Sequence, residues 1–196
     1  MERFPFLRVL ALVALAALPG ASPAQSLSDP GVGLGAHLGL SEGRSADGPS
    51  LTGGLHLRYR LTASLGLEGS IGYRSETVDD GSGPLLSLLE VPVTGTGQLF
   101  FFPRSRVQPF LLAGAGLHVV KTTPEGRNTT AGGSTEALFA LHVGAGIDVR
   151  PSRSSAIHLD ARWVFLEPTA IADLAAEGYA VRSGYLSVVL GVTFFR

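Results

Sequence analysis

Apolar and polar residues alternate along most of this sequence, in about eight separate stretches. In the clearest stretch one face would carry Ile157, Leu159, Ala161, Trp163 and Phe165. The positions between them are His158, Asp160, Arg162 and Val164. Because successive side chains of a strand point to opposite faces, this pattern predicts strands with one apolar and one mostly polar face. A soluble sandwich would bury the apolar face, whereas a membrane barrel would turn it toward lipid.

The pattern predicts eight strands, over residues 32–40, 51–61, 65–75, 88–102, 107–120, 138–150, 157–165 and 185–195. The connections between them alternate in length. The long ones cover residues 41–50, 76–87, 121–137 and 167–184, and the short ones cover 62–64, 103–106 and 151–155. Outer-membrane barrels combine short periplasmic turns with long outer loops, whereas a sandwich has no reason to keep this rhythm. The predicted fold is therefore all-β, an eight-stranded antiparallel up-and-down transmembrane β-barrel.

Strand length and aromatic residues fit the same fold. About ten residues that rise ~3.3 Å each, tilted by roughly 45°, climb about 23 Å, which is close to the ~25 Å apolar band of such barrels. Aromatic residues gather near the predicted strand ends, where they suit the interfacial girdles. They are Phe100, Phe101, Phe102, Phe110, Trp163, Phe165, Phe194 and Phe195. Pro92 lies inside a predicted strand and lacks an N–H, so a β-bulge is expected there.

The first 24 residues have the layout of a secretory signal peptide. Two arginines precede an apolar run over residues 9–18, and the small residues at 22–24 predict cleavage before Gln25. The run is too short for a spanning helix, which needs about 20 apolar residues. The sequence therefore divides into a signal peptide, 1–24, and a barrel domain, 25–196.

Composition narrows the chemistry. The sequence has no cysteine, which excludes disulfides, cysteine-bound zinc, thiol nucleophiles and a lipid-attachment cysteine. Charged residues make up 16% of the chain, below the roughly 25% of a typical soluble domain. Removal of Glu2, Arg3 and Arg8 with the signal leaves 13 basic and 15 acidic residues, a net charge of −2. Without a basic excess, nucleic acid is not an expected partner.

The central part of the sequence resembles a known family. Residues 89–93 read Leu-Glu-Val-Pro-Val, residues 98–102 read Gln-Leu-Phe-Phe-Phe, and residues 108–117 read Gln-Pro-Phe-Leu-Leu-Ala-Gly-Ala-Gly-Leu. This block resembles the small outer-membrane β-barrel domain family, to which the eight-stranded barrels of OmpA and OmpX type are related. The resemblance implies a bacterial outer membrane, with its lipids and lipopolysaccharide as surroundings and the barrel assembly machinery as a partner during biogenesis. It implies no shared catalytic residues.

Chemistry-bearing residues concentrate in the inward phase of the predicted strands. They are His37, His56, Arg58, Arg60, Glu68, Arg74, Glu90, His118, His142, Asp148, Arg150, His158, Asp160 and Arg162. An eight-stranded barrel is barely wide enough for side chains, and buried charges need opposite partners, so we expect a polar network that fills the lumen. Glycines of this phase, among them Gly114 and Gly144, are expected to make room for it. A metal site, a proton relay or a catalytic cluster is the alternative role, but no catalytic, cofactor or metal site is predicted.

One catalytic alternative has named residues. His158 and Asp160 share a face, as His–Asp pairs do in some hydrolases, and Ser187 on the neighbouring strand could supply a nucleophile. The His-x-Ser type signature of outer-membrane enzymes that act on lipid A acyl chains is absent. The sequence therefore favours a non-enzymatic structural or surface-interaction protein with a plugged lumen, whose long loops contact an extracellular ligand. A lipid A-modifying enzyme and a narrow small-solute channel remain the alternatives.

Overall fold

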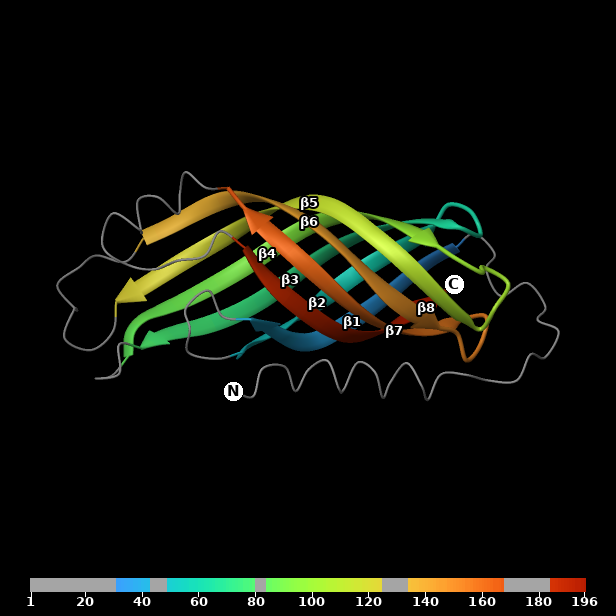
Figure 1. Cartoon of the computed structure of the whole chain (residues 1–196), viewed down its shortest axis with the longest axis horizontal. Coiled ribbons are helices and arrows are strands. Elements are labelled where there is room, and N and C mark those ends of the chain that lie inside the picture. Colours follow the sequence, from blue (N-terminus) through green and yellow to red (C-terminus); the bar gives the residue numbers. More distant parts are fainter. Residues whose placement is uncertain (1–30, 43–48, 80–83, 125–133, 168–183) are drawn as a thin grey trace, which may run out of the picture.

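A computed structural model describes residues 31–42, 49–79, 84–124, 134–167 and 184–196, which form one closed β-barrel (Figure 1). Its strands are β1 (Gly31–Glu42), β2 (Pro49–Arg60), β3 (Leu65–Asp79), β4 (Pro84–Phe100), β5 (Val107–Pro124), β6 (Ser134–Val149), β7 (Ser155–Leu166) and β8 (Gly184–Phe195). The eight-stranded antiparallel up-and-down barrel predicted from the sequence is confirmed. The predicted signal peptide lies outside the described residues.

Pairing of the first strand with the last closes the barrel. β1 pairs with β8 from Gly33 opposite Phe195 to Ser41 opposite Ser187, and every other strand pairs with its neighbours in sequence. Closure leaves the sheet without an open edge, which is what a lipid environment demands, because hydrocarbon cannot satisfy a free backbone N–H or C=O. No helix within the described residues is long and apolar enough to cross a membrane.

The outer surface of the barrel is apolar on all eight strands. Leu38 of β1 is 68% exposed, Leu117 of β5 is 55% exposed and Leu190 of β8 is 57% exposed. A soluble monomer rarely exposes contiguous apolar surface of this extent. The outward phase therefore contacts lipid, and the inward phase faces the lumen.

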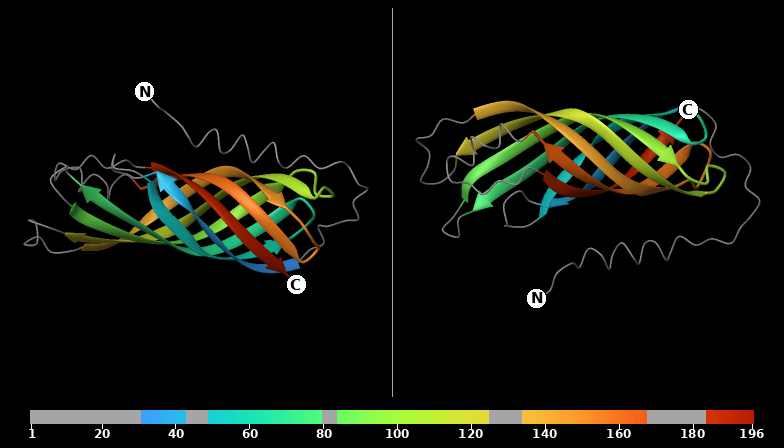
Figure 2. Two further views of the ribbon diagram at one scale, coloured as in Figure 1. Left: turned by 90° about the horizontal axis from the view of Figure 1, so that it is seen from below. Right: turned by 45° about the horizontal axis from the view of Figure 1, so that its top comes forward.

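The two ends of the barrel differ. At one end, here called the short-turn end, residues 61–64, 101–106 and 150–154 connect the strands, and the chain leaves β8 (Figure 1). The opposite end is here called the loop end. The strands β3 to β6 are 15 to 18 residues long, whereas each of the other strands has 12 residues. These four strands reach furthest at the loop end (Figure 2). Part of the predicted long connections is therefore strand, because β-favouring residues such as Thr77, Thr123 and Thr135 continue the pairing.

The prediction of a β-bulge at Pro92 is wrong. β4 pairs with β3 at Val93 and again at Glu90 in one unbroken register, and Pro92 pairs with His118 of β5. The missing N–H interrupts the β3–β4 pairing locally without inserting an extra residue. The register shift between β3 and β4 lies instead between Val78 and Asp79, near the loop end.

Because the outer face contacts lipid, a charged substitution there should lower the free energy of unfolding by an amount that depends on its depth in the membrane. Leu159 lies near the middle of β7, so Leu159→Arg should lower the free energy of unfolding by about 2–4 kcal/mol, the range for arginine at the bilayer midplane. Leu61→Arg, beside a short turn, should cost about 0–1 kcal/mol because the guanidinium reaches the interface. Reversible urea unfolding in lipid vesicles measures both. Equal costs for the two substitutions would contradict the orientation of β7 in the membrane.

Candidate functional site: the barrel lumen

The structure places all fourteen residues predicted for the lumen in the inward phase. His37 and Arg162 are half-buried, and the other twelve are buried. The described lumen contains five arginines and five carboxylates. These are Arg58, Arg60, Arg74, Arg150 and Arg162, with Glu68, Glu76, Glu90, Asp148 and Asp160. The described lumen therefore contains as many arginines as carboxylates.

Arg58 is held between two carboxylates near the short-turn end. Its Nε and Nη2 donate to Glu68 Oε2 at 3.1 and 2.7 Å, and its Nη1 donates to Asp148 Oδ1 at 3.5 Å. The side chains of all three residues are at most 1% exposed. A charge buried this deeply is tolerated only when it is paired and hydrogen-bonded.

Arg60 completes this layer on the side of the short turns. Its Nη2 donates to Asp148 Oδ2 at 3.0 Å and to Gln108 Oε1 at 2.8 Å. Gln108 in turn donates to the backbone oxygens of Pro103 and Ser105, both at 2.9 Å. The lumen network is thereby tied to the connection between β4 and β5.

Two aromatic rings pack in the same layer. Phe100 and Phe110 are 2% and 1% exposed and lie in the lumen, so the expectation that they join the interfacial girdle is wrong. They share the phase of Gln98 and Gln108, and the alternation turns them inward. The Arg60 guanidinium lies 3.3 Å from the centroid of the Phe100 ring, a cation–π contact. We call this layer the short-turn plug; it consists of Arg58, Arg60, Glu68, Gln98, Phe100, Gln108, Phe110 and Asp148.

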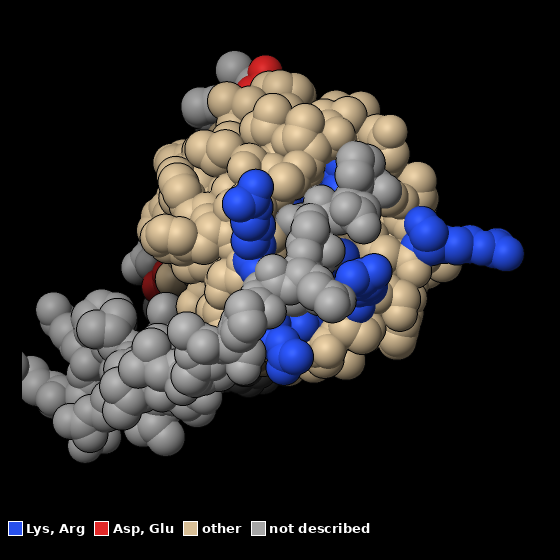
Figure 3. All heavy atoms as spheres, turned by 90° about the vertical axis from the view of Figure 1, so that its right-hand side faces the viewer, with Lys and Arg blue, Asp and Glu red and all other residues tan. Residues whose placement is uncertain are grey.

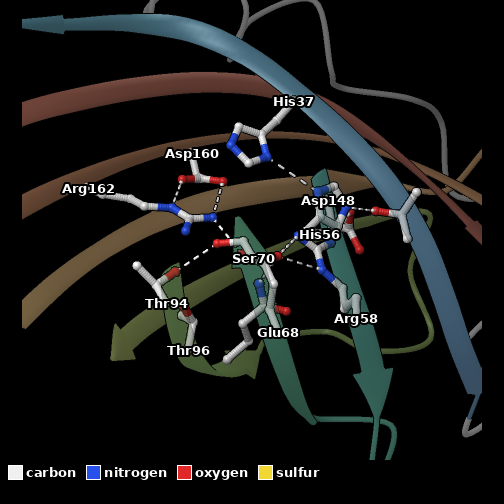
Figure 4. Close-up of polar contacts among 12 residues, drawn as sticks. His37, His56, Arg58, Glu68, Ser70, Thr94, Thr96, Asp148, Asp160 and Arg162 are labelled. Carbon is white, nitrogen blue, oxygen red and sulfur yellow. Dashed lines mark hydrogen bonds and ion pairs between the residues drawn. The ribbon is translucent and has the colours of Figure 1, made fainter. Parts of the chain in front are cut away.

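Arg162 links the plug to the middle of the lumen. Its Nε donates to Asp160 Oδ1 at 2.6 Å and its Nη2 to Glu68 Oε1 at 2.9 Å. Figure 4 shows this guanidinium facing both oxygens of Asp160. Glu68 therefore bridges Arg58 and Arg162, which lie on strands far apart in the sequence.

Imidazoles occupy the middle of the lumen beside small hydroxyl side chains. His56 bonds Thr193 at 2.8 Å and His142 bonds Thr96 at 2.9 Å. The His56 ring lies 5.1 Å from that of His158, centroid to centroid. A Cβ on Gly35, Gly114 or Gly191 would collide with one of the His56, His142 and His158 rings. Glycine at these positions is what allows rings to fit between the strands.

A second ion-pair cluster lies toward the loop end. Arg74 donates to Glu90 Oε2 at 3.0 Å and to Glu76 Oε2 at 2.7 Å. Glu90 also accepts from the Tyr185 hydroxyl at 3.0 Å and contacts His118 Nδ1. Each carboxylate oxygen of Glu90 therefore has at least one polar partner.

On the side of β4 to β8, the lumen near the loop end is apolar, which the sequence analysis did not predict. Its side chains pack together with Tyr185 and consist of Leu88, Val120, Leu138, Ala140, Val164 and Leu166. Below this apolar cap lies a cavity of about 60 Å³ whose lining includes His37, His118, His142 and Arg162. Such a volume holds a few water molecules.

The structure does not bring His158 and Ser187 together as a hydrolase base and nucleophile. His158 pairs with Gly191 across β7 and β8, whereas Ser187 pairs with Arg162, four positions along the strand. Neither ring nitrogen of His158 has a hydrogen-bond partner among the described residues. Within those residues, no group of three histidine, cysteine or acidic side chains is arranged to hold a metal ion.

Several members of the network are absent from the predicted set. Glu76, Gln98, Gln108, Tyr185 and Thr193 all bond predicted lumen residues. The signal for them was the strand phase. Glu76, Gln98 and Gln108 each lie an even number of positions from a predicted lumen residue of their own strand, and Tyr185 and Thr193 alternate with the outward-facing Leu186 and Phe194 of β8. Their polar character alone did not distinguish them from loop residues.

The family is decided by comparison of the sequence with known families. A model of the outer membrane protein beta-barrel domain matches residues 9–194, nearly the whole chain. The chain belongs to the outer membrane protein beta-barrel domain family. Membership implies a location in a bacterial outer membrane. By the rule for such barrels, the short-turn end then faces the periplasm and the loop end faces outward.

Solved structures share the fold at low identity. The N-terminal β-barrel domain of OprF from Pseudomonas aeruginosa is 14% identical, with a TM-score of 0.55 over 86% of this chain and 100% of that chain. Neisserial surface protein A is 15% identical, with a TM-score of 0.53 over 90% and 99%. Ail of Yersinia pestis is 16% identical, with a TM-score of 0.50 over 85% and 97%. No curated protein sequence matches the chain.

The short-turn plug predicts that Asp148 is a major contributor to stability. Asp148→Ala would leave Arg58 and Arg60 without their shared carboxylate, and breaking such a buried pair costs about 3–5 kcal/mol. Glu136→Ala, on the exposed surface at the loop end, should change the free energy of unfolding by no more than about 0.5 kcal/mol.

Urea unfolding in vesicles measures both variants. Combining Arg60→Ala with Asp148→Ala should cost less than the sum of the two single changes, because each removes a partner of the other. Additive costs, or an Asp148→Ala variant as stable as the wild type, would show that the plug does not depend on this pairing.

Proposed function

We propose that this protein is a structural or surface-interaction protein of the outer membrane and not an enzyme. In this proposal the barrel is the anchor, and its loop end presents a polar surface to macromolecules outside the cell. The observation that carries the proposal is the packing of the lumen with buried side chains. The short-turn plug packs paired charges and two aromatic rings at one end, and the apolar cap packs side chains of β4 to β8 together toward the other.

The loop end supports an interaction role through its shape. β3 to β6 continue as a paired sheet beyond the other strands, with Val120 opposite Glu136 and Lys121 opposite Thr135. The exposed side chains of this extension are mostly polar, among them Thr77, Lys121, Thr123, Thr135 and Glu136. A rigid polar sheet held above the membrane suits recognition by another macromolecule, because its side chains need little ordering on binding.

The two alternatives have less support in the described residues. A narrow channel would need a continuous path of ionic width, whereas the cavity lined by His37, His118 and Arg162 in the described interior has a volume of about 60 Å³. A lipid A-modifying enzyme would need a nucleophile beside a base, whereas Ser187 and His158 lie apart along β8 and β7. Release of a fatty acid from lipid A by the purified protein would nevertheless favour the enzyme.

Biogenesis follows from the same proposal. We infer that residues 1–24 direct export and that the barrel assembly machinery inserts the folded barrel. Lipopolysaccharide then surrounds the loop end, and phospholipid surrounds the short-turn end.

The chain offers a direct test of surface exposure, because Lys121 is its sole lysine and lies exposed at the loop end. A membrane-impermeant amine-reactive biotin reagent should label the protein on intact cells. Lys121→Arg keeps the charge but removes the reactive amine, so its label should be lost. If the wild type were labelled only after the outer membrane had been permeabilised, the loop end would face inward and the proposed role would fail.

A further inference from the structure

Arginines gather at the short-turn end of the barrel. Arg104 and Arg106 lie in the connection between β4 and β5, Arg153 lies in the connection between β6 and β7, and Arg196 follows β8. All four are exposed. We call them the basic rim. They are separate from the lumen arginines, which are buried or half-buried.

Backbone hydrogen bonds hold the segments of the basic rim side by side. The N–H of Arg150 donates to the carbonyl oxygen of Arg106 at 2.8 Å, which joins the two connections. The N–H of Phe195 donates to the carbonyl oxygen of Ser154 at 2.8 Å, which joins the second connection to the chain end. The segments that carry the four arginines therefore adjoin one another along the short-turn end.

Negative charge in the described residues is placed elsewhere. Residues 61–64, 101–106 and 150–154 contain no aspartate or glutamate, and the exposed glutamates Glu42, Glu136 and Glu167 lie toward the loop end. Arg104, Arg106 and Arg196 form no ion pair with a carboxylate in the described part of the chain. Figure 3 looks onto this end and shows several basic side chains on it, with acidic atoms visible only toward the edge of the view.

The arginines lie just past the apolar band. Arg104 is two residues beyond Phe102, which is 72% exposed, and Arg196 is two residues beyond Phe194, which is 63% exposed. Arg196 directly follows the end of β8, so about 7 Å of extended chain separate it from Phe194 at a rise of ~3.3 Å per residue. Arg104 lies in the tight turn in which the Ser105 N–H donates to the carbonyl oxygen of Phe102 at 2.8 Å. Aromatic rings anchor at the membrane interface, so each guanidinium reaches the level of the lipid headgroups.

We propose that the basic rim binds the phosphate groups of anionic phospholipids in the leaflet around the short-turn end. A guanidinium matches a phosphate with two parallel hydrogen bonds, and an exposed arginine at headgroup level gains from negative surface potential. The exposed aromatic rings beside Arg104 and Arg196 favour lipid over a soluble acidic partner. The rim would thereby fix the depth of the barrel through lipid charge.

The test uses the full chain in nanodiscs that contain equal amounts of phosphatidylcholine and phosphatidylglycerol. Native mass spectrometry identifies the lipids that stay bound when the protein is released. Each arginine should favour the anionic lipid about fivefold at low salt. The combined variant Arg104→Gln, Arg106→Gln, Arg153→Gln and Arg196→Gln should retain the two lipids in nearly equal amounts.

Lys121→Gln is the matched control, because it removes an exposed cation from the opposite end and should leave the lipid preference unchanged. Each variant is first checked for heat-modifiable migration in gels, the sign of a closed barrel. Raising the salt should reduce the preference of the wild type, a readout that needs no variant. Equal retention of both lipids by the wild type, or an unchanged preference in the combined variant, would overturn the proposal. Arginine-dependent binding of peptidoglycan fragments without lipid preference would assign the rim to a different partner.

Discussion

The pairing of buried arginines with buried carboxylates is the constraint on which this structure depends. Eight strands must close because lipid cannot satisfy a free backbone edge, and a barrel of that size leaves a lumen just wide enough for side chains. Five arginines and five carboxylates share that space in the described residues. Removing one partner leaves the other as an uncompensated buried charge, which lowers the free energy of unfolding. The stability of each lumen residue therefore depends on its partners.

The network also separates the lumen from the function that we propose. Its layers run from the short-turn plug through the histidines to the Arg74–Glu90 cluster, and the apolar cap lies beside that cluster near the loop end. In the proposed function the interior holds the barrel together. Contact with other molecules is then made at the two ends, where the polar extension of β3 to β6 and the basic rim offer surfaces of different charge.

The sequence predicted the barrel because its two strongest signals, a period of two and alternating connection lengths, are local. It also predicted the inward face of the fourteen lumen residues, since phase follows from the same period, but it missed Glu76, which was expected in a loop. Partners were not predictable: Glu68 bridges Arg58 and Arg162 because of the stagger between strands, which no local pattern records. Phe100 and Phe110 were misassigned because aromatic residues near strand ends occur in both phases, and the phase decides which rings face lipid.

The central claim is that packed, paired side chains close the lumen. Conductance in planar bilayers tests it most directly, with a mock preparation from the same host that lacks the protein as control. The folded barrel should give no stable porin-sized steps, because the buried side chains of the short-turn plug and the apolar cap occupy the lumen. Reproducible porin-sized steps from the folded protein, absent from the mock preparation, would contradict the account.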